Sequence, residues 1–332
     1  MSDLDAAIGK YIEDVIRLSR DDIEQSAASR KWFLTRLRNE IEKHDDGPQL
    51  LAGDDGFVNF GSYFKGTKVG DVDEFDVLVV IDSNSGVFSL GGNRVGDGQG
   101  TVDPNHKYDE RFRKADGSGV SPSKILNWLH EIVADVVYSF GGEEPQIHGP
   151  AIMARIESQD LALDLVPAGV FTRKSDNSTF YNIAKGDGDD GWILTSPRED
   201  IEELDDAAED RPNLKNIIRI VKRVRDQYGL GVSSFALERQ VLRYARDCGF
   251  WSQYLAVELP YAVRSVADAI EAGKIPDLFN PSSNLLADAR DRRGAACTYR
   301  SIAQDLDELY ENQGDYDADD LYEAVHDLLE NE

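Results

Sequence analysis

The sequence has few of the features that mark secreted, metal-clustered or membrane-spanning proteins. Among its 332 residues there are only two cysteines, Cys248 and Cys297, which fit neither a disulfide framework nor a zinc cluster and predict buried free thiols. No apolar run approaches the ~20 residues that cross a bilayer, and the N-terminal stretch MSDLDAAIGKYIEDV is acidic, with no signal region. We therefore expect a cytoplasmic protein with no membrane partner.

Positive charge is also scarce. The chain has 36 Lys and Arg against 63 Asp and Glu, for a formal net charge of −27. Proteins bind nucleic acids non-specifically by neutralising phosphates with Lys and Arg, so no large nucleic-acid footprint is expected, although a local basic groove stays open. With 41% hydrophobic residues, the composition is that of a globular protein of one large or two ordinary domains.

The N-terminal part of the chain mixes helical and strand patterns. Apolar residues at helical spacing over 4–43 predict one or two long helices. The run FDVLVVI at 75–81 is rich in β-branched residues and predicts a strand buried on both faces. Ser121 followed by Pro122 is a helix-start signal, and the stretch 151–171 predicts a β-hairpin. This half therefore predicts a mixed α/β fold.

The patterns change near residue 200, and from there to the C-terminus they are mostly helical. We therefore expect two domains, 1–200 and 201–332. The last 28 residues contain twelve acids and no Lys or Arg. They predict a final helix with an acidic face, with a docking surface as the alternative.

A long Gly- and Asp-rich insertion occupies residues 83–119. A connection of that length inside a compact domain is a functional lid or a surface excursion. Its HKYDERFRK cluster is basic and aromatic, which also fits contact with an activating ligand. The residues leave these interpretations open.

The stretch DEFDVLVV places acids directly against a core strand. Residues two apart in a strand face the same way, so Glu74 and Asp76 should project together, and Asp164 on another short strand could supply a third carboxylate. Three convergent carboxylates repel one another unless divalent cations lie between them, which predicts a site for two Mg²⁺ ions, with Mn²⁺ as an alternative. Asp71 and Asp73 form a competing pair.

Gly61 and Ser62 precede these acids by about a dozen residues. Glycine allows the backbone to approach a triphosphate closely, and serine offers a hydroxyl beside backbone amides. A Gly-Ser dipeptide is most often only a turn, so its meaning depends on the acids that follow it.

Together, GSYFKGT and DEFDVLVV resemble the DNA polymerase β-type nucleotidyltransferase superfamily. More narrowly, they are similar to the cGAS/DncV-like nucleotidyltransferases (CD-NTases), the SMODS-type oligonucleotide cyclases of bacteria and archaea. Members carry Gly-Ser, then an acid-x-acid pair at the head of a strand, then a third acid on a later strand. This register selects Glu74 and Asp76 over Asp71 and Asp73.

Other segments carry the same resemblance. The pair Gly66-Thr67, the stretch LDLVPAG around Asp164 and the stretch GWILTSP are typical of bacterial oligonucleotide cyclases. Glutamate at position 74 departs from the Asp that bacterial members more often have there, and it is more similar to animal cGAS-like enzymes. A carboxylate is kept, so the implied metal-binding role is unchanged.

The helical half resembles the family as well. IIRIVKRVRDQYG looks like the helix whose lysine reaches the donor triphosphate, which implies that role for Lys222. GVSSFALERQVL resembles the segment in which a serine contacts phosphate and an aromatic ring stacks on a base, which implies Ser234 and Phe235. The alternatives are that Lys222 is a surface lysine and Phe235 a core residue.

The resemblance implies an α+β fold, in which a polymerase β-like nucleotidyltransferase lobe with a small mixed sheet and an α-helical lobe form a bilobal molecule with a central cleft. Residues 1–200 would be the catalytic domain with N-terminal brace helices, and 201–332 would close the cleft. The implied activity is the Mg²⁺-dependent joining of NTPs into a cyclic or linear oligonucleotide, with release of pyrophosphate. The product would be a second messenger that acts on a separate effector in CBASS-type antiphage defence.

Two other functions stay open at this point. A tRNA CCA-adding or other nucleotide-adding transferase belongs to the same superfamily, but it needs a basic RNA channel, which the acidity disfavours. A catalytically silent nucleotide- or RNA-binding sensor on the same fold is the second alternative. The complete set of three acids argues against it.

Overall fold

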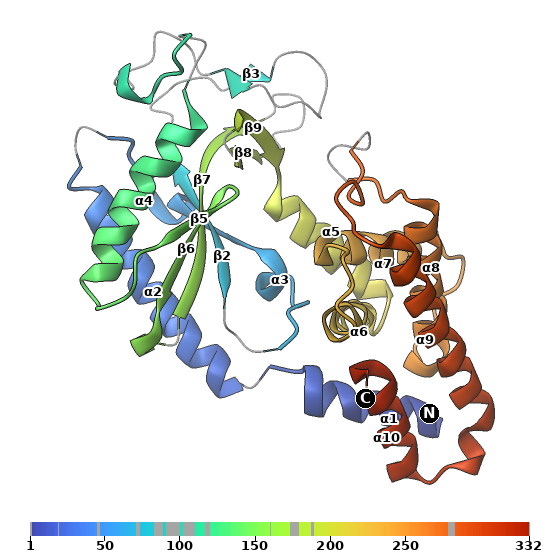
Figure 1. Cartoon of the computed structure of the whole chain (residues 1–332). Helices are drawn as coiled ribbons and strands as arrows, with labels where there is room; N and C mark the ends of the chain where they lie inside the picture. Colours follow the sequence, from blue (N-terminus) through green and yellow to red (C-terminus); the bar gives the residue numbers. More distant parts are fainter. Residues whose placement is uncertain are drawn as a thin grey trace. The chain divides into compact units, whose positions relative to one another are not determined.

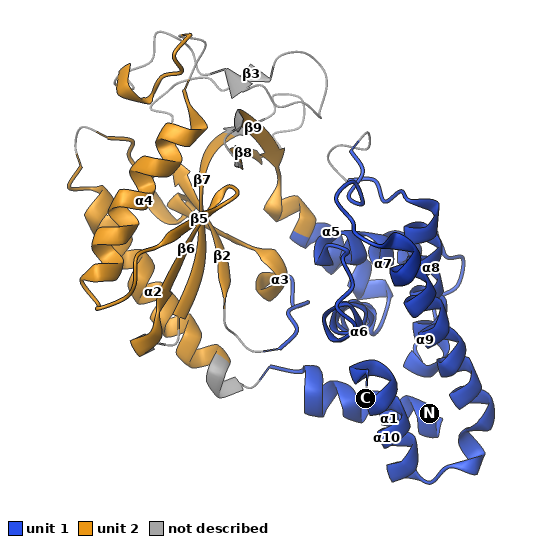
Figure 2. Ribbon diagram, in the orientation of Figure 1, with its two compact units in different colours: residues 1–18, 65–71, 201–332 blue, residues 19–64, 72–200 orange. Residues whose placement is uncertain are grey.

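In the computed structural model the chain forms two compact units, coloured separately in Figure 2. The helical unit comprises residues 1–18, 65–71 and 201–332, and the sheet unit comprises 19–64 and 72–200. The residues that the structure describes are 2–18, 20–44, 47–70, 74–82, 89–90, 100–101, 110–116, 120–159, 161–172, 179–186, 189–277 and 283–331.

The chain passes between the two units several times. A short segment, 65–71, belongs to the helical unit although the residues on both sides of it belong to the sheet unit. The last passage falls after Asp200, inside helix α5 (Pro197–Asp210). Residues 1–18 also belong to the helical unit. The two functional domains expected from the sequence, 1–200 and 201–332, stay a prediction.

The sheet unit is built on one mixed sheet (Figure 1). The strands follow the order β1-β2-β7-β6-β5, and β8 pairs with both β7 and β9. The β2–β7 pair is parallel and the remaining pairs of this sheet are antiparallel. The mixed α+β class predicted from the sequence is confirmed. The strands are β1 (Phe57–Phe60), β2 (Phe75–Ile81), β5 (Gln146–His148), β6 (Ala151–Ile156), β7 (Leu161–Thr172), β8 (Thr179–Gly186) and β9 (Asp189–Thr195).

Strand β2 is buried on both faces, as its apolar run predicts. Ile81 packs with Ile125 of helix α4 (Pro122–Tyr138). Leu78 and Val80 instead belong to a cluster with Val58 of β1. Because side chains alternate along a strand, the even-numbered residues of β2 face away from α4. Asp76 therefore lies on the face of the sheet opposite to that helix.

Helices α4 and α2 (Arg20–Ile41) cover one face of the sheet. Helix α4 begins at the predicted signal, since the Ser121 hydroxyl accepts a hydrogen bond from the Lys124 amide at 3.3 Å and Pro122 occupies the first helical position. Helix α2 packs against α4 and the sheet. Together with α1 (Asp3–Tyr11) and a π-helical turn (Ile12–Ile16), α2 accounts for the helical pattern predicted over 4–43.

The predicted hairpin over 151–171 is confirmed as β6 and β7, joined by a 3-10 turn at Glu157–Gln159. Much of the insertion at 83–119 lies outside the described residues. Its described part includes the pair β3 (Ser89–Leu90) and β4 (Gly100–Thr101). Within the HKYDERFRK cluster, Phe112 is buried against the sheet unit, 4% exposed.

The helical unit encloses its own hydrophobic core. The mostly helical pattern predicted after residue 200, including the final helix, is confirmed. Helices α8 and α9 pack against each other, α7 packs on α6 and α8, and α10 packs on α1 (Figure 1). These helices are α6 (Leu214–Gln227), α7 (Ser234–Asp247), α8 (Leu255–Ala272), α9 (Arg292–Asn312) and α10 (Ala318–Glu330).

The two ends of the chain meet in this unit. The Tyr11 hydroxyl of α1 donates to the Glu330 carboxylate of α10, and Arg223 Nε of α6 donates to the same carboxylate at 2.8 Å. The final helix is thus held by a half-buried ion pair as well as by its buried apolar residues Leu321, Val325 and Leu329.

Both cysteines are free, but the prediction that they are buried is wrong. Cys248 is half-buried and Cys297 is exposed. On α9 the core-facing positions include Ala296 and Tyr299, so Cys297 falls on the outer side of the helix. No helix in the described part of the chain is long and apolar enough to cross a membrane.

Candidate active site

Three carboxylates converge on one face of the sheet. Glu74 directly precedes β2, Asp76 is the second residue of β2, and Asp164 lies opposite Asp76 in the parallel β2–β7 register. Each offers an oxygen atom, and these oxygens lie within 4.8 Å of one another. The predicted meeting of three acids from distant parts of the chain is therefore present in the structure.

Electrostatics in this cluster favour a bound cation. Burial, then a hydrogen bond to Glu74, then the charges of Glu74 and Asp76 raise the pKa of Asp164 to about 8. Ionising all three carboxylates near neutral pH is therefore unfavourable unless a cation lies among them. All of the donors are hard oxygen atoms, and such ligands suit Mg²⁺ or Mn²⁺. The residues present fit a divalent metal site.

Gly61 is required beside this cluster for two reasons. Its φ of +78° lies in the left-handed region that favours glycine. A Cβ at this position would also stand 1.7 Å from Oδ2 and 2.5 Å from Cγ of Asp76. The backbone at residue 61 can therefore lie this close to the Asp76 carboxylate only because glycine has no side chain.

Ser62 follows in a single helical turn, α3 (Gly61–Phe64), directly after β1. Its side chain is half-buried, and its hydroxyl has no hydrogen-bond partner among the described residues. The hydroxyl is thus available to an incoming ligand. The competing acids Asp71 and Asp73 lie outside the described residues.

Lys222 is not a surface lysine on its helix. It is 5% exposed on α6, and its Nζ donates to Glu238 Oε2 at 3.0 Å, to the Thr67 hydroxyl at 3.1 Å and to the Thr67 carbonyl at 3.3 Å. An ammonium group has three donors, so these partners use all of them. Desolvation lowers the pKa of Lys222, and the charge of Glu238 opposes that change.

Ser234 and Phe235 lie at the start of α7 and are both half-buried. Ser233 caps the helix, because its hydroxyl accepts from the Ala236 amide at 3.1 Å. The Ser234 hydroxyl has no partner among the described residues. Phe235 presents its ring to Lys65, whose Nζ lies 5.0 Å from the ring centroid.

The predicted residues therefore form two groups. Gly61, Ser62 and the three acids belong to the sheet unit, whereas Lys222, Ser234 and Phe235 belong to the helical unit. Sequence reasoning missed Glu238, although a signal was present. Glu238, Val241 and Ala245 are spaced three and four residues apart on the buried side of α7, so an acid occupies a core position.

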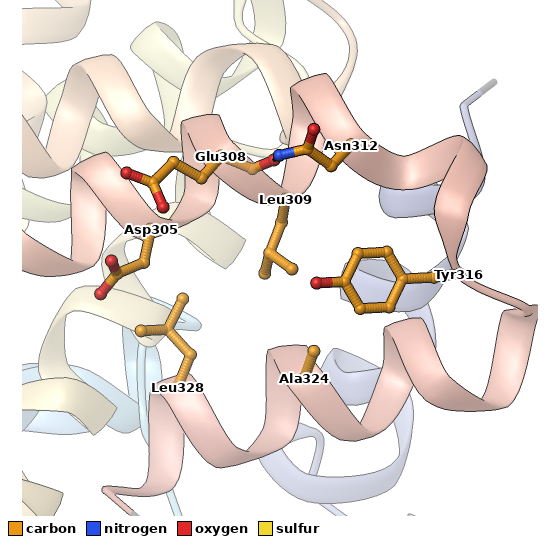
Figure 3. A pocket seen from close by; sticks show the side chains of 7 residues that line it. All are labelled: Asp305, Glu308, Leu309, Asn312, Tyr316, Ala324 and Leu328. Atoms are coloured by element: carbon orange, nitrogen blue, oxygen red, sulfur yellow. The ribbon is translucent and has the colours of Figure 1, made fainter.

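The helical unit also contains a cavity of about 240 Å³ formed by α9 and α10, shown in Figure 3. Acidic and amide groups come from α9, apolar side chains come from both helices, and Tyr316 joins them from the connection between α9 and α10. None of the predicted site residues lines this cavity. Its lining residues are Asp305, Glu308, Leu309, Asn312, Tyr316, Ala324 and Leu328.

No protein-family model and no curated protein matches the sequence. Solved structures do resemble the fold. Escherichia coli MS115-1 CdnC with ATP is similar at a TM-score of 0.67 and 13% sequence identity, over 98% of this chain and 97% of that one. The complex of the same CdnC with HORMA-deltaN gives a TM-score of 0.64 at 13% identity, over 98% and 96% of the two chains.

At this identity the likeness speaks to the fold alone. It extends over almost the whole chain, so it includes the sheet that carries the three carboxylates as well as the helices. The chain has the CD-NTase fold that its Gly-Ser and acidic motifs predict.

Proposed function

We propose that this protein is a Mg²⁺-dependent nucleotidyltransferase that joins NTPs into a cyclic or linear oligonucleotide and releases pyrophosphate. One observation carries the proposal: Glu74, Asp76 and Asp164 offer oxygens within 4.8 Å of one another on a CD-NTase fold. A cluster of this kind is costly without cations, since the carboxylates repel one another. In a metal-dependent enzyme, bound divalent cations would offset this repulsion.

The chain's own residues have separate parts in this proposal. Glu74, Asp76 and Asp164 hold two metal ions, and Gly61 keeps the backbone close to Asp76 without displacing it. When bound, the ions would activate a ribose hydroxyl and stabilise the leaving pyrophosphate. The remaining contribution of the protein is positioning, which is the larger part of catalysis in phosphoryl transfer.

The donor nucleotide is proposed to be an NTP, and the ATP bound by the structurally similar CdnC supports this choice. The hydroxyls of Ser62 and Ser234 have no partners among the described residues, so both can donate to phosphate oxygens. Lys222 would bind the triphosphate by exchanging one of its Thr67 contacts for a phosphate oxygen. Phe235 would stack on a base, in exchange for its contact with Lys65.

We further propose that the product is a cytoplasmic second messenger that acts on a separate effector, in CBASS-type antiphage defence. The net charge of −27 supports a small nucleotide acceptor over a long RNA, because an RNA substrate requires a basic surface along its path. A nucleotide-adding transferase acting on tRNA is therefore the weaker candidate.

The test is to incubate the purified protein with Mg²⁺ and labelled NTPs, treat the reaction with phosphatase and identify products by mass spectrometry. Small phosphatase-resistant products are the expected result. Label transferred to added tRNA would establish the nucleotide-adding alternative instead. Nucleotide binding without pyrophosphate release would establish a silent sensor.

A further inference from the structure

A buried acid of helix α7 joins groups that lie far from it in the sequence. The Glu238 side chain is 3% exposed. Its Oε1 accepts from Lys65 Nζ at 2.6 Å, and its Oε2 accepts from the Thr67 hydroxyl at 2.8 Å and from Lys222 Nζ at 3.0 Å. The group formed by Glu238, Lys65, Thr67 and Lys222 is here named the Glu238 clamp.

The clamp holds a turn that requires glycine. Lys65 and Thr67 reach the same carboxylate from positions on either side of Gly66, whose φ of +66° lies in the left-handed region. A Cβ at Gly66 would meet nothing closer than 3.7 Å, so backbone conformation rather than space selects glycine here. The Gly66-Thr67 pair thus turns the chain so that both neighbours of Gly66 face Glu238.

Charge makes the clamp strong. Burial alone would raise the pKa of Glu238, but the charges of Lys222 and Lys65 and the hydrogen bonds from Lys65 and Thr67 lower it to about 2. Glu238 is therefore ionised throughout the neutral range. A buried carboxylate bonded to two ammonium groups is strongly destabilised when one partner is removed, and charge-assisted hydrogen bonds fix their geometry closely.

The clamp also has a defined place in the chain. Residues 65–71 belong to the helical unit, while Gly61 and Ser62 just before them and Glu74 and Asp76 just after them belong to the sheet unit. The segment that joins the Gly-Ser pair to the acidic pair is therefore held in the helical unit, whereas both pairs belong to the sheet unit. Its anchor is Glu238.

We propose that Glu238 is a positioning residue: by holding residues 65–70, the Glu238 clamp fixes the chain directly after the turn that carries Ser62, and so orients the Ser62 hydroxyl for the incoming NTP. This role rests on the proposed function. Glu238 itself touches neither metal nor substrate. Loss of the clamp should weaken nucleotide binding as well as destabilise the fold, whereas loss of a buried ion pair elsewhere in the helical unit should only destabilise the fold.

The experiment compares Glu238→Gln with Glu203→Gln as a matched control. Glu203 is also a buried carboxylate of the helical unit, 9% exposed, and it is paired with Arg239 and Arg246 rather than with residues 65–71. Both changes keep side-chain volume and remove one buried charge. Thr67→Val, with Thr67→Ser as its conservative partner, tests the same clamp by removing a single hydroxyl.

Three quantities are measured for each variant: melting temperature, KM for NTP in the presence of Mg²⁺, and hydrogen exchange of the amides at 65–70. We expect both glutamine variants to melt at lower temperature. Of the two glutamine variants, only Glu238→Gln should raise KM, by about tenfold to a hundredfold. It should also accelerate hydrogen exchange of the amides at 65–70 by at least roughly tenfold. Thr67→Val should follow it in part, and Thr67→Ser should behave as wild type.

Equal exchange at 65–70 in wild type and Glu238→Gln would overturn the clamp, whatever the enzyme's activity. A KM shift of the same size in Glu203→Gln would also overturn it, because the effect would then be a general loss of stability. If the wild type neither turns over nor binds NTP, the proposed function fails and the positioning role fails with it. The exchange measurement still decides separately whether Glu238 anchors the segment.

Discussion

At the scale of single residues, the account depends on how closely Gly61 lies against Asp76. Replacing Gly61 by Ala should lower turnover about a hundredfold, because the new Cβ must displace the Asp76 carboxylate by more than 1 Å. The measurement is kcat together with the Mg²⁺ concentration at half-maximal rate, which should rise.

Gly53→Ala is the control for this change. Gly53 has nearly the same φ, +73°, in the same unit, but nothing lies within 4 Å of its added Cβ. Both variants carry the backbone strain of roughly 1–2 kcal/mol, and only Gly61→Ala disturbs a carboxylate. Equal loss of activity in the two variants would assign the effect to strain alone.

A pH dependence follows from Asp164. Its folded-state pKa is raised to about 8 from an ordinary value of 3.8, so between these two pH values the folded protein holds a proton that the unfolded chain has released. Stability without metal should therefore fall as pH rises through this window. The melting temperature of wild type relative to Asp164→Asn, in a chelator, should decline from pH 4 to 8.

Added Mg²⁺ should remove most of that decline, since a bound cation favours the ionised carboxylate. A difference between wild type and Asp164→Asn that is flat with pH, or that grows as pH rises, would contradict the assigned protonation of the metal-free site.

The sequence predicted the acids at this scale because strand alternation and motif register can be read locally. It did not reveal the surroundings of Lys222. The partners of that lysine, Glu238 and Thr67, come from another helix and from a turn 155 residues away, and no local pattern specifies such contacts. Cys297 was misassigned because a single thiol carries no periodic signal of its own.

At the scale of elements, the strongest local signals gave the correct boundaries. Strand β2 and helix α4 begin at the residues expected, because one is an uninterrupted β-branched run and the other has a serine cap followed by proline. The parallel register of β2 with β7 could not be predicted in the same way. It is fixed by packing between distant segments, and it is the register that places Asp164 beside Asp76.

The cap of α4 offers a test that separates stability from function. Ser121→Ala removes the hydroxyl that accepts from the Lys124 amide, and it should cost about 1 kcal/mol of unfolding free energy. Denaturant unfolding measures this loss. KM and kcat should stay at wild-type values, because α4 lies on the face of the sheet away from Asp76.

At the scale of the whole molecule, net charge separates a small-molecule enzyme from a polymer-binding one. At −27, the chain should bind tRNA or duplex DNA more weakly than the roughly 10⁻⁴–10⁻⁶ M typical of non-specific binders at physiological salt. A mobility-shift titration at two salt concentrations checks this. Micromolar binding that weakens steeply with salt would contradict this expectation and favour a nucleic-acid substrate.

The fold was predicted through a resemblance in several short segments, above all GSYFKGT and DEFDVLVV. The structural similarity to CdnC confirms this fold, although the sequence identity is only 13%. This is understandable physically. Many apolar residues can fill the same core, whereas few residue types can hold a metal or allow the backbone conformation of Gly61. A short motif can therefore indicate a fold even where overall sequence identity is low.

The central claim is that Glu74, Asp76 and Asp164 hold catalytic metal. The most direct measurement is Mg²⁺-dependent pyrophosphate release from the four NTPs by wild type, Asp76→Asn and Asp73→Asn. The account predicts a loss of roughly a thousandfold or more in Asp76→Asn, with the fold intact, and near-normal release in Asp73→Asn. Normal release by Asp76→Asn together with an inactive Asp73→Asn would contradict it.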